Sequence, residues 1–463
     1  MEVSMKPNIL LFIADQHRLD SVGAYGRFNI STPNIDSLAR EGAFFEHAFT
    51  PIPVCAPARQ ALLSGYAPES FGALWNNNFI ATPTVKPNPA FHTAVLKKEG
   101  YQCGLMGKWN SSQEFTPSDF GFLDHIDNGE YNKITALKYP DLKYKNKWFG
   151  EPSPIALDDS KTHWQAKKAC ELISRYEENE SPWYVRVDID DPHLPCRPSE
   201  PFASMYDPDS VEPWDSCQDS LENKPYIQRQ QLINWNLEDL TWDDWKPCVS
   251  AYRGMVSQID DAFGRIIKHL KHLGVYDDTI IIYTSDHGDL CGGHGMLDKH
   301  YVLYDDVTRV PLIVRWPKAV QMGLRINEFV SNCLDLGATL ADLCGLPGVD
   351  FAHGRSWAPL LRGEHQTERD FEVSSSNGQQ FGLYTQRSIR TNEWLYVWNM
   401  TDIDELYDVK QDHGQKNNRI SDQSLVSVLS DLRIRLRNEL IRRDDPFGKS
   451  GWLADQLLLN RKI

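Results

Sequence analysis

A single cysteine, Cys55, stands at the start of a helix-like run with an arginine one turn further on. The stretch PIPVCAPARQALLSG begins at Pro51 and ends at Ser64 and Gly65. Most free cysteines pack as small apolar side chains. Reactive thiols instead lie in electropositive surroundings, and the N–H groups of a helix start together with the guanidinium of Arg59 can hold an anion. Both a structural thiol and a nucleophile are consistent with this spacing.

Two pairs of polar side chains follow apolar runs and carry the atoms that a divalent cation binds. NILLFIADQH contains Asp15 and Gln16, and DDTIIIYTSDHGD contains Asp286 and His287. Carboxylate and amide oxygens suit Ca²⁺, and one imidazole also admits Mn²⁺. Either aspartate alone could instead cap the helix or turn that follows it. Because there are two such pairs, we expect one divalent metal site, with Ca²⁺ preferred and Mn²⁺ as the alternative.

Three further candidates carry positive charge or can transfer a proton. Lys108 lies in GLMGKWN and Lys299 in GMLDKHYVLYDD, although most lysines are simply solvated. His193 lies in DDPHLPCRP, just after an apolar run, and the nearby Pro192 and Pro195 would hold it rigidly. A lone histidine is more often structural, but a rigidly positioned one suits a general acid or base.

The elements around these candidates alternate between strands and helices. Apolar runs typical of strands buried on both faces occupy residues 8–15, 182–190, 277–289 and 310–317. Residues 32–42 and 251–273 have helical signals, and glycines end both helices. The alternation predicts an α/β fold with a large, mostly parallel central sheet flanked by helices. In such folds ligands bind at the carboxyl ends of the strands, where Asp15 and Asp286 lie.

From about Phe371 the pattern changes. Residues 382–400 are typical of a hairpin, residues 404–420 are rich in turns, and residues 424–445 form an amphipathic helix. We predict a large domain over 1–370 and a smaller C-terminal α+β subdomain over 371–463, with an antiparallel sheet and one helix. The Pro-, Trp- and Asp-rich region 196–247 predicts a long insertion of loops over the site.

Composition limits the partners and the compartment. The 463 residues carry 64 acidic and 48 basic side chains, and the net charge of −16 argues against a nucleic-acid partner. The nine cysteines include no C-x-x-C pair, so neither a disulfide framework nor a zinc ribbon is expected. The apolar run 9–14 is too short for a signal peptide, and no stretch approaches the length of a membrane span. We therefore expect a cytoplasmic protein without a membrane partner.

In combination, these motifs resemble those of the formylglycine-dependent sulfatases, which belong to the alkaline phosphatase superfamily. CAPAR followed by QALLSG is similar to the family signature C-x-P-x-R. The family landmarks that the chain resembles, in family order, are NILLFIADQHRLDSVGAYG, TPNIDSLAREGAFFEHAF, GYQCGLMGKW, TSDHGDLCGGHGMLDKH, RVPLIVRWP and ELYDV. The resemblance covers nearly the whole chain, and an ordered set of motifs is far more specific than the signature alone. It implies an alkaline phosphatase-like fold with a catalytic sulfatase domain.

The resemblance implies a nucleophile that is made after translation. In such enzymes a separate maturation enzyme oxidises the cysteine, here Cys55, to formylglycine, and the aldehyde is hydrated to a diol. One hydroxyl attacks the sulfur of a sulfate ester and the alcohol leaves. The second hydroxyl is then deprotonated, and sulfate is eliminated as the aldehyde reforms. A side chain with a single hydroxyl, such as serine, has no second hydroxyl to deprotonate and so cannot eliminate sulfate in this way.

The resemblance also implies roles for the candidates. The residues that match the metal ligands are Asp15, Gln16, Asp286 and His287. Arg59 matches the arginine that steadies the diol, and His193 matches a general acid near the leaving oxygen. Lys108 and Lys299 match the lysines that hold the sulfate oxygens.

Two positions depart from the commonest family pattern. Gln16 stands where many members have aspartate, and the Asp-Gln form also occurs in phosphonate monoester hydrolases and some sulfatases. Asn110 stands where many members have a histidine, and an amide can donate a hydrogen bond to sulfate but cannot shuttle a proton. His294 or His300, close to Lys299 in sequence, is the candidate to replace that histidine.

The expected activity is exo-acting hydrolysis of a carbohydrate sulfate of the glycosaminoglycan type, from a mono- or oligosaccharide. Trp75, with Asn76 and Asn77, is expected at the rim, where an aromatic ring can stack on a sugar. Arg197 can pair with the carboxylate of a uronic acid, although an ordinary surface arginine explains it as well. We also count Asn110 and His300 among the substrate-binding candidates.

Two other functions remain open. A phosphonate or phosphate ester hydrolase on the same scaffold would bind a tetrahedral anion in the same way. A non-catalytic glycan-binding relic would keep Cys55 as an unmodified thiol.

Overall fold

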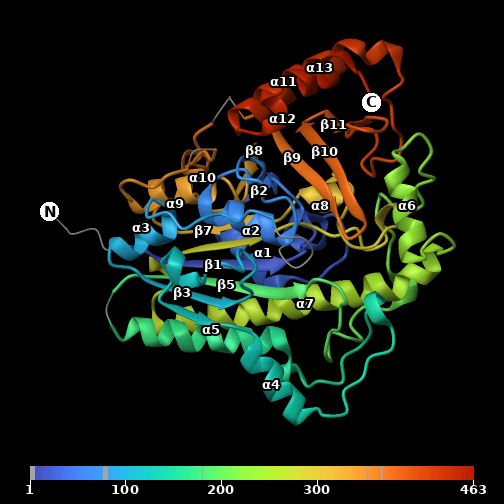
Figure 1. The fold of residues 1–463 in the computed structure, drawn as a ribbon. Helices are drawn as coiled ribbons and strands as arrows, with labels where there is room; N and C mark the ends of the chain where they lie inside the picture. The colour runs from blue at the N-terminus through green and yellow to red at the C-terminus, as the bar shows by residue number, and fades with distance from the viewer. Residues whose placement is uncertain (1–5, 77–81, 180, 352, 366–368, 463) are drawn as a thin grey trace.

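The computed structural model describes residues 6–76, 82–179, 181–351, 353–365 and 369–462 (Figure 1). An eight-stranded sheet in the order β4-β3-β5-β1-β6-β7-β2-β8 forms its centre. The strands are β1 (Asn8–Asp15), β2 (Ala43–Phe49), β3 (Gln102–Gly107), β4 (Asp124–Ile126), β5 (Trp183–Pro192), β6 (Thr279–Ser285), β7 (Leu312–Arg315) and β8 (Leu324–Ser331). Within this sheet β7 runs antiparallel to both its neighbours, and the other pairs are parallel. The predicted mostly parallel sheet is therefore confirmed.

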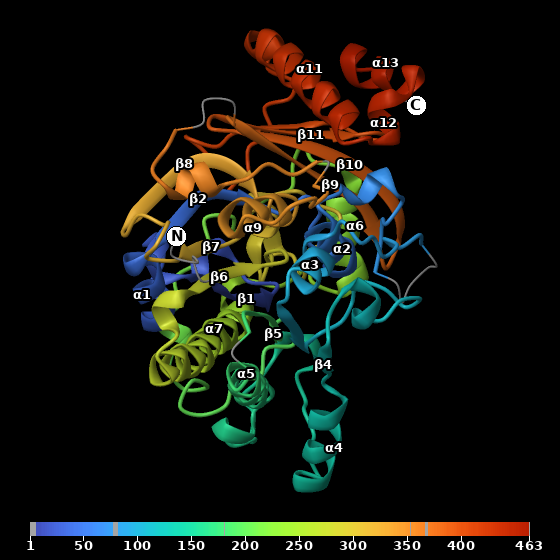
Figure 2. The same cartoon turned by 90° about the vertical axis from the view of Figure 1, so that its left-hand side faces the viewer.

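Strand β1 is apolar throughout because its two faces enter two different cores. Leu10 and Phe12 belong to the core on one side of the sheet, and Leu11 and Ile13 to the core on the other. The helices α1 (Pro33–Glu41), α5 (Lys161–Glu177) and α7 (Trp242–Leu273) cover the first side. The helices α2 (Cys55–Ser64), α3 (His92–Lys98) and α9 (Leu336–Cys344) cover the second (Figure 2). A strand buried in this way has no polar face, as its sequence predicts.

The region 196–247 differs from its prediction. It was expected to consist of loops, but it contains α6 (Tyr226–Trp235) and the first turns of α7, which begins well before the predicted Ala251. A capping box between Thr241 and Asp244 starts α7 and precedes Pro247 inside the helix. The reciprocal cap satisfies backbone N–H groups that would otherwise be unpaired, which explains a helix start in a Pro- and Asp-rich sequence.

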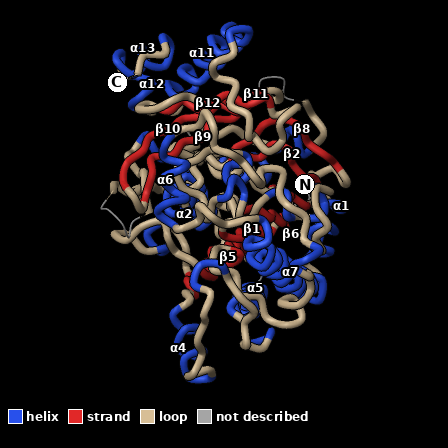
Figure 3. The backbone as a smooth tube through the Cα atoms, turned by 90° about the vertical axis from the view of Figure 1, so that its right-hand side faces the viewer, coloured by secondary structure: helices blue, strands red, loops and turns tan. Residues whose placement is uncertain are grey.

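A second sheet consists of four antiparallel strands and lies towards the top of the view in Figure 3, where all strands are red. Its strands, in the order β12-β11-β10-β9, are β9 (Phe371–Gln379), β10 (Gly382–Thr391), β11 (Trp394–Asn399) and β12 (Glu405–Asp408). The helices α11 (Val426–Arg442), α12 (Pro446–Lys449) and α13 (Gly451–Leu459) pack on its outer face (Figure 1). The predicted small antiparallel sheet is confirmed, and α11 corresponds to the one predicted helix. α12 and α13 were not predicted, and β12 lies in the segment predicted to be turns.

The second sheet packs against segments of the chain that adjoin the first sheet. Val397 and Tyr407 of the second sheet form one apolar cluster with Val302 and Val307, which precede β7. The amide of Ser375 in β9 also donates to the carbonyl of Pro51, just before α2, at 2.8 Å. The division at residue 370 stays a prediction.

Three further α-helices of the described residues are α4 (Gly129–Lys138), which projects from the body of the molecule in Figure 2, α8 (Asp305–Thr308) and α10 (Ala358–Leu361). Among the described residues, no helix is at once sufficiently long and sufficiently apolar to span a membrane.

Candidate active site

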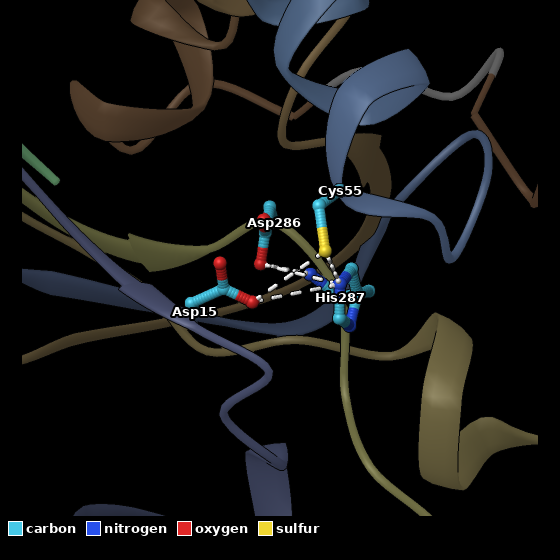
Figure 4. Close-up of side chains that lie close together, drawn as sticks. All are labelled: Asp15, Cys55, Asp286 and His287. Atoms are coloured by element: carbon cyan, nitrogen blue, oxygen red, sulfur yellow. Dashed lines mark hydrogen bonds and ion pairs between the residues drawn. The ribbon is translucent and has the colours of Figure 1, made fainter. Parts of the chain in front are cut away.

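The sheet topology brings the predicted nucleophile and metal ligands together. Asp15 ends β1, and Asp286 and His287 directly follow β6, the strand parallel to β1. Cys55 is the first residue of α2, and its Sγ lies 3.1 Å from His287 Nε2 and 3.7 Å from Asp15 Oδ1 (Figure 4). One candidate ligand atom from each of these four buried residues lies within 4.8 Å of all the others.

Arg59, one turn after Cys55, joins the carboxyl ends of three strands. Its guanidinium donates to Asp15 Oδ2 at 3.0 Å, to Asp286 Oδ2 at 3.0 Å and to Asp188 Oδ2 at 2.5 Å. Burial lowers the pKa of Arg59, but the three carboxylates outweigh it and hold the pKa well above its ordinary value. Asp188 lies inside β5 and was given no role from the sequence, where the only signal for it was its place near the end of the apolar run 182–190. Arg59 therefore positions the acidic side chains of the site.

The amide of Gln16 is oriented by two buried aspartates that the sequence prediction missed. Its Nε2 donates to Asp289 Oδ2 at 2.8 Å and to Asp298 Oδ1 at 3.1 Å. Its Oε1 therefore faces Lys299 Nζ, at 2.7 Å. An aspartate at position 16 could not donate to these acceptors and would add a third buried negative charge beside them. This explains why an amide fits here, and the positions of Asp289 and Asp298 next to the predicted His287 and Lys299 were the available signal.

The predicted lysines and histidine surround the same centre. Lys299 Nζ contacts Asp298 Oδ1 at 2.9 Å and donates to His193 Nε2 at 3.1 Å. Lys108 Nζ donates to Asp15 Oδ2, and the Lys108 side chain is 21% exposed. Burial lowers the pKa of Lys108, but Asp15 outweighs it and the pKa lies above its ordinary value. Lys108 is therefore cationic and partly exposed, whereas Lys299, whose pKa Asp298 raises against the effect of burial, is cationic but buried with its Nζ bonded to three partners.

The thiol of Cys55 is electronically different from other buried thiols of the chain. Burial and the Asp15 carboxylate raise the pKa of Cys55, but Lys108, Lys299 and His287 outweigh them and hold it well below its ordinary value. In contrast, burial raises the pKa of Cys103 to about 12. The site at Cys55 therefore stabilises negative charge, as a site for sulfate must.

The donor set fits a divalent cation. His287 Nδ1 donates to the carbonyl of Gly288 at 2.9 Å, so Nε2 is the ring nitrogen that faces the cluster. Asp15 Oδ1 and Asp286 Oδ1 each lie 3.7 Å from that Nε2. Two carboxylates and one imidazole therefore meet beside Cys55, a donor set that suits a divalent cation, while the amide oxygen of Gln16 accepts from Lys299 Nζ at 2.7 Å.

The predicted substrate-binding residues do not all lie where the sequence placed them. Trp75 does not match its expected place at the rim, because it is only 4% exposed and its Nε1 donates to the carbonyl of Asn377 in β9 at 3.0 Å. β9 packs against the segment that carries Trp75, and this packing buries the indole ring. Asn76 accepts from the amide of Ala56 at 2.8 Å and so caps α2, while Asn77 lies outside the described residues.

The remaining candidates divide between the site and its surroundings. His300 is buried, and its Nε2 lies 3.2 Å from Asp298 Oδ2, beside Lys299. His294 is instead bonded to Asp219 at 2.7 Å, so its role as a replacement for the usual histidine finds no support. Asn110 is partly buried, two residues after Lys108. The guanidinium of Arg197 lies 3.8 Å from the ring centre of Tyr144, so it stacks on that ring.

Comparison with known proteins agrees with this geometry. The Sulfatase family model matches residues 7–346, and the chain therefore belongs to the sulfatase family and is a sulfuric ester hydrolase. A second model, described as N-sulphoglucosamine sulphohydrolase, C-terminal, matches residues 292–442. The recognition of the family from its motifs is confirmed.

Individual relatives match over almost the full chain. The uncharacterized sulfatase YidJ of Escherichia coli (strain K12) is 27% identical over 96% of this chain and 90% of that protein. A delta 4,5-hexuronate-2-O-sulfatase of Bacteroides thetaiotaomicron is 26% identical, with the same coverage of 96% and 90%. The phosphonate monoester hydrolase of Agrobacterium radiobacter has a similar structure, with a TM-score of 0.81, 23% identity and coverage of 95% and 96%. At that identity the structural similarity establishes the fold alone.

Proposed function

We propose that the protein releases sulfate from carbohydrate sulfate esters, using a formylglycine made from Cys55 and one divalent cation. The observation that carries the proposal is the position of Cys55, at the start of α2 and inside the buried cluster of Asp15, Asp286 and His287. A thiol with a purely structural role would not need surroundings that stabilise negative charge on it. A separate maturation enzyme that oxidises Cys55 is part of the proposal.

The residues around Cys55 have separate tasks. A formylglycine at position 55 supplies hydroxyl groups as the nucleophile, and a cation held by Asp15, Gln16, Asp286 and His287 supplies positive charge beside them. Arg59 keeps the carboxylates in place through its three ion pairs. Lys108 and Lys299 donate to the sulfate oxygens, on which charge accumulates in the transition state.

His193 is placed to serve the leaving group. Its Nδ1 donates to the carbonyl of Leu194 at 2.8 Å, so its Nε2 faces Lys299. When Lys299 turns to a sulfate oxygen, Nε2 becomes free to hold the proton that the departing alcohol oxygen requires.

The names of relatives support the proposed substrate class. Relatives include proteins named as an N-acetylglucosamine-6-O-sulfatase and a delta 4,5-hexuronate-2-O-sulfatase. These names favour a sugar sulfate of the glycosaminoglycan type, which we propose here for an exo-acting enzyme.

The substrate class is tested by comparing initial rates on sulfated mono- and disaccharides, an aryl sulfate and an aryl phosphonate. We expect kcat/KM for the best sugar sulfate to exceed that for the aryl phosphonate by at least about tenfold, or 1.4 kcal/mol. A preference of the same size for the phosphonate would establish the phosphonate hydrolase alternative instead.

Removal of the metal should inactivate the enzyme. After chelation and buffer exchange, we expect kcat to fall by roughly 10²-fold or more, the typical cost of losing one electrostatic contact in the transition state. Added Ca²⁺ should restore the rate, and a larger recovery with Mn²⁺ would change the proposed metal. Full activity in protein shown by elemental analysis to be free of metal would contradict the metal site.

A further inference from the structure

A hollow formed by segments far apart in the sequence lies beside the catalytic cluster. Residues 145–149, the end of α6 at 234–237, the tip of the β9–β10 hairpin at 380–381 and Leu297 enclose about 610 Å³. α6 and the hairpin lie side by side in Figure 1, and the rings of Tyr226 and Tyr384 meet there at 5.9 Å. We name this hollow the aromatic pocket.

Three of the four aromatic side chains that line the pocket pack against one another. Trp235 stands between Trp148 and Phe381, with ring centres 6.1 and 6.2 Å away and near-perpendicular planes. Trp148 is 49% exposed and Phe381 44% exposed. Large rings are rarely left exposed together on a soluble protein unless they bind something. The edge-to-face contacts hold the rings in place, so each can offer a face to a ligand with little loss of side-chain entropy.

Polar groups surround the rings. The lining contains two ammonium groups, of Lys145 and Lys147, and four side-chain amides, of Asn146, Asn234, Asn236 and Gln380. Amides bond to hydroxyl groups, and the two ammonium groups attract a carboxylate or a sulfate. Aromatic faces combined with amides and cations suit a sugar ring that carries an anionic substituent better than a purely apolar ligand.

The pocket shares a wall with the catalytic cluster. Leu297 lines the pocket and precedes Asp298, whose Oδ1 bonds to Lys299. Gln380, also in the lining, donates from Nε2 to Asp298 Oδ2 at 3.5 Å. A group bound in the pocket therefore lies against residues that adjoin Asp298, the aspartate bonded to the sulfate-binding lysine.

The loop that carries Trp148 is also tied to the segment that carries His193. The amide of Glu151 donates to the carbonyl of Cys196 at 3.1 Å, and Arg197 stacks on Tyr144 at the start of the loop. Arg197 thus anchors the pocket through Tyr144, which gives a structural reason for an arginine at this position. The loop that lines the pocket therefore packs against the segment that carries His193, the proposed proton donor.

We propose that the aromatic pocket binds the sugar unit next to the sulfated one, with its ring on Trp148 or Phe381 and its anionic substituent near Lys145 and Lys147. This inference rests on the proposed function, because it places the leaving-group side of a sulfated oligosaccharide in the pocket. It makes these residues determinants of oligosaccharide specificity.

The test compares two substrates in three variants. The substrates are a sulfated hexosamine and a disaccharide in which the same sulfated hexosamine is joined to a uronic acid. We expect Trp148→Ala and Phe381→Ala each to lower the ratio of kcat/KM for the disaccharide to that for the monosaccharide by about tenfold, as the loss of one aromatic contact predicts. The matched control is Trp452→Ala on α13, a residue 87% exposed and distant in sequence, which should leave the ratio as it is.

A charge variant separates stacking from ion pairing without disturbing the core. Lys147 is exposed, so Lys147→Gln should fold normally and should raise KM for the uronate disaccharide more than for its methyl ester. An unchanged ratio in both aromatic variants, or a ratio that falls equally in Trp452→Ala, would overturn the inference. Dependence on Trp148 for aryl sulfates but not for the disaccharide would assign the pocket to an aryl group and would also overturn it.

Direct binding distinguishes failure of this inference from failure of the proposed function. If the wild-type protein released sulfate from neither sugar, the proposed function would fail. Titration of Cys55→Ala protein with the disaccharide, followed by tryptophan fluorescence, would still report on the pocket. Binding that is lost in the Cys55→Ala, Phe381→Ala double variant supports the pocket, and binding that is unchanged there contradicts it.

Discussion

Replacing Cys55 with alanine should abolish sulfate release while the protein stays folded. The nucleophile is lost with the side chain, and we expect kcat to fall by at least roughly 10⁴-fold, in the range seen when a covalent nucleophile is removed. Because only one small buried group disappears, the free energy of unfolding should change by about 1 kcal/mol. Sulfate release and denaturant unfolding measure the two quantities.

The matched control is a second buried cysteine. Cys103, in β3, has a pKa raised by burial to about 12 and no contact with the site, so Cys103→Ala should retain turnover. Mass spectrometry of the peptide containing position 55, from protein made with the maturation enzyme, should show an aldehyde in place of the thiol. Turnover by the Cys55→Ala variant, or an intact thiol in fully active protein, would refute the proposed nucleophile. An intact thiol in protein without activity would favour the glycan-binding relic.

Replacing Arg59 with alanine should have the largest effect on stability. Arg59 is fully buried and compensates for Asp15, Asp188 and Asp286, so its loss leaves buried negative charges without their partner. Breaking a buried ion pair in this way typically costs 3–5 kcal/mol. We expect the free energy of unfolding to fall by about that amount, and sulfate release to be lost because the carboxylates no longer hold their geometry.

The metal gives this prediction an internal control. A cation at Asp15 and Asp286 would offset part of the uncompensated charge, so the loss of stability in Arg59→Ala should be larger with chelator than with Ca²⁺. Arg59→Lys retains the charge but not the planar fork that reaches three carboxylates, and it should recover only part of the stability. A loss below about 1 kcal/mol in chelator would show that Arg59 does not hold the three carboxylates together.

The local sequence determined the elements that carry the chemistry. β1 could be predicted from its unbroken apolar run, because a strand buried on both faces has no polar side to show. The ends of β1 and β6 placed Asp15 and Asp286 at one edge, because parallel strands end at the same edge of a sheet. Cys55 and Arg59 could be predicted as neighbours because one turn of helix separates them.

The tertiary structure alone decided which partners these residues have. Nothing in the local pattern shows that Arg59 reaches Asp188, or that Gln16 donates to Asp289 and Asp298, since these contacts join segments far apart in the chain. Trp75 was misplaced for the same reason, because the strand that buries it lies some three hundred residues further on. Side-chain type and spacing determine which chemistry is available to this chain. The packing of distant segments decides burial, charge compensation and the shape of the aromatic pocket, because these depend on atoms that only the folded chain brings together.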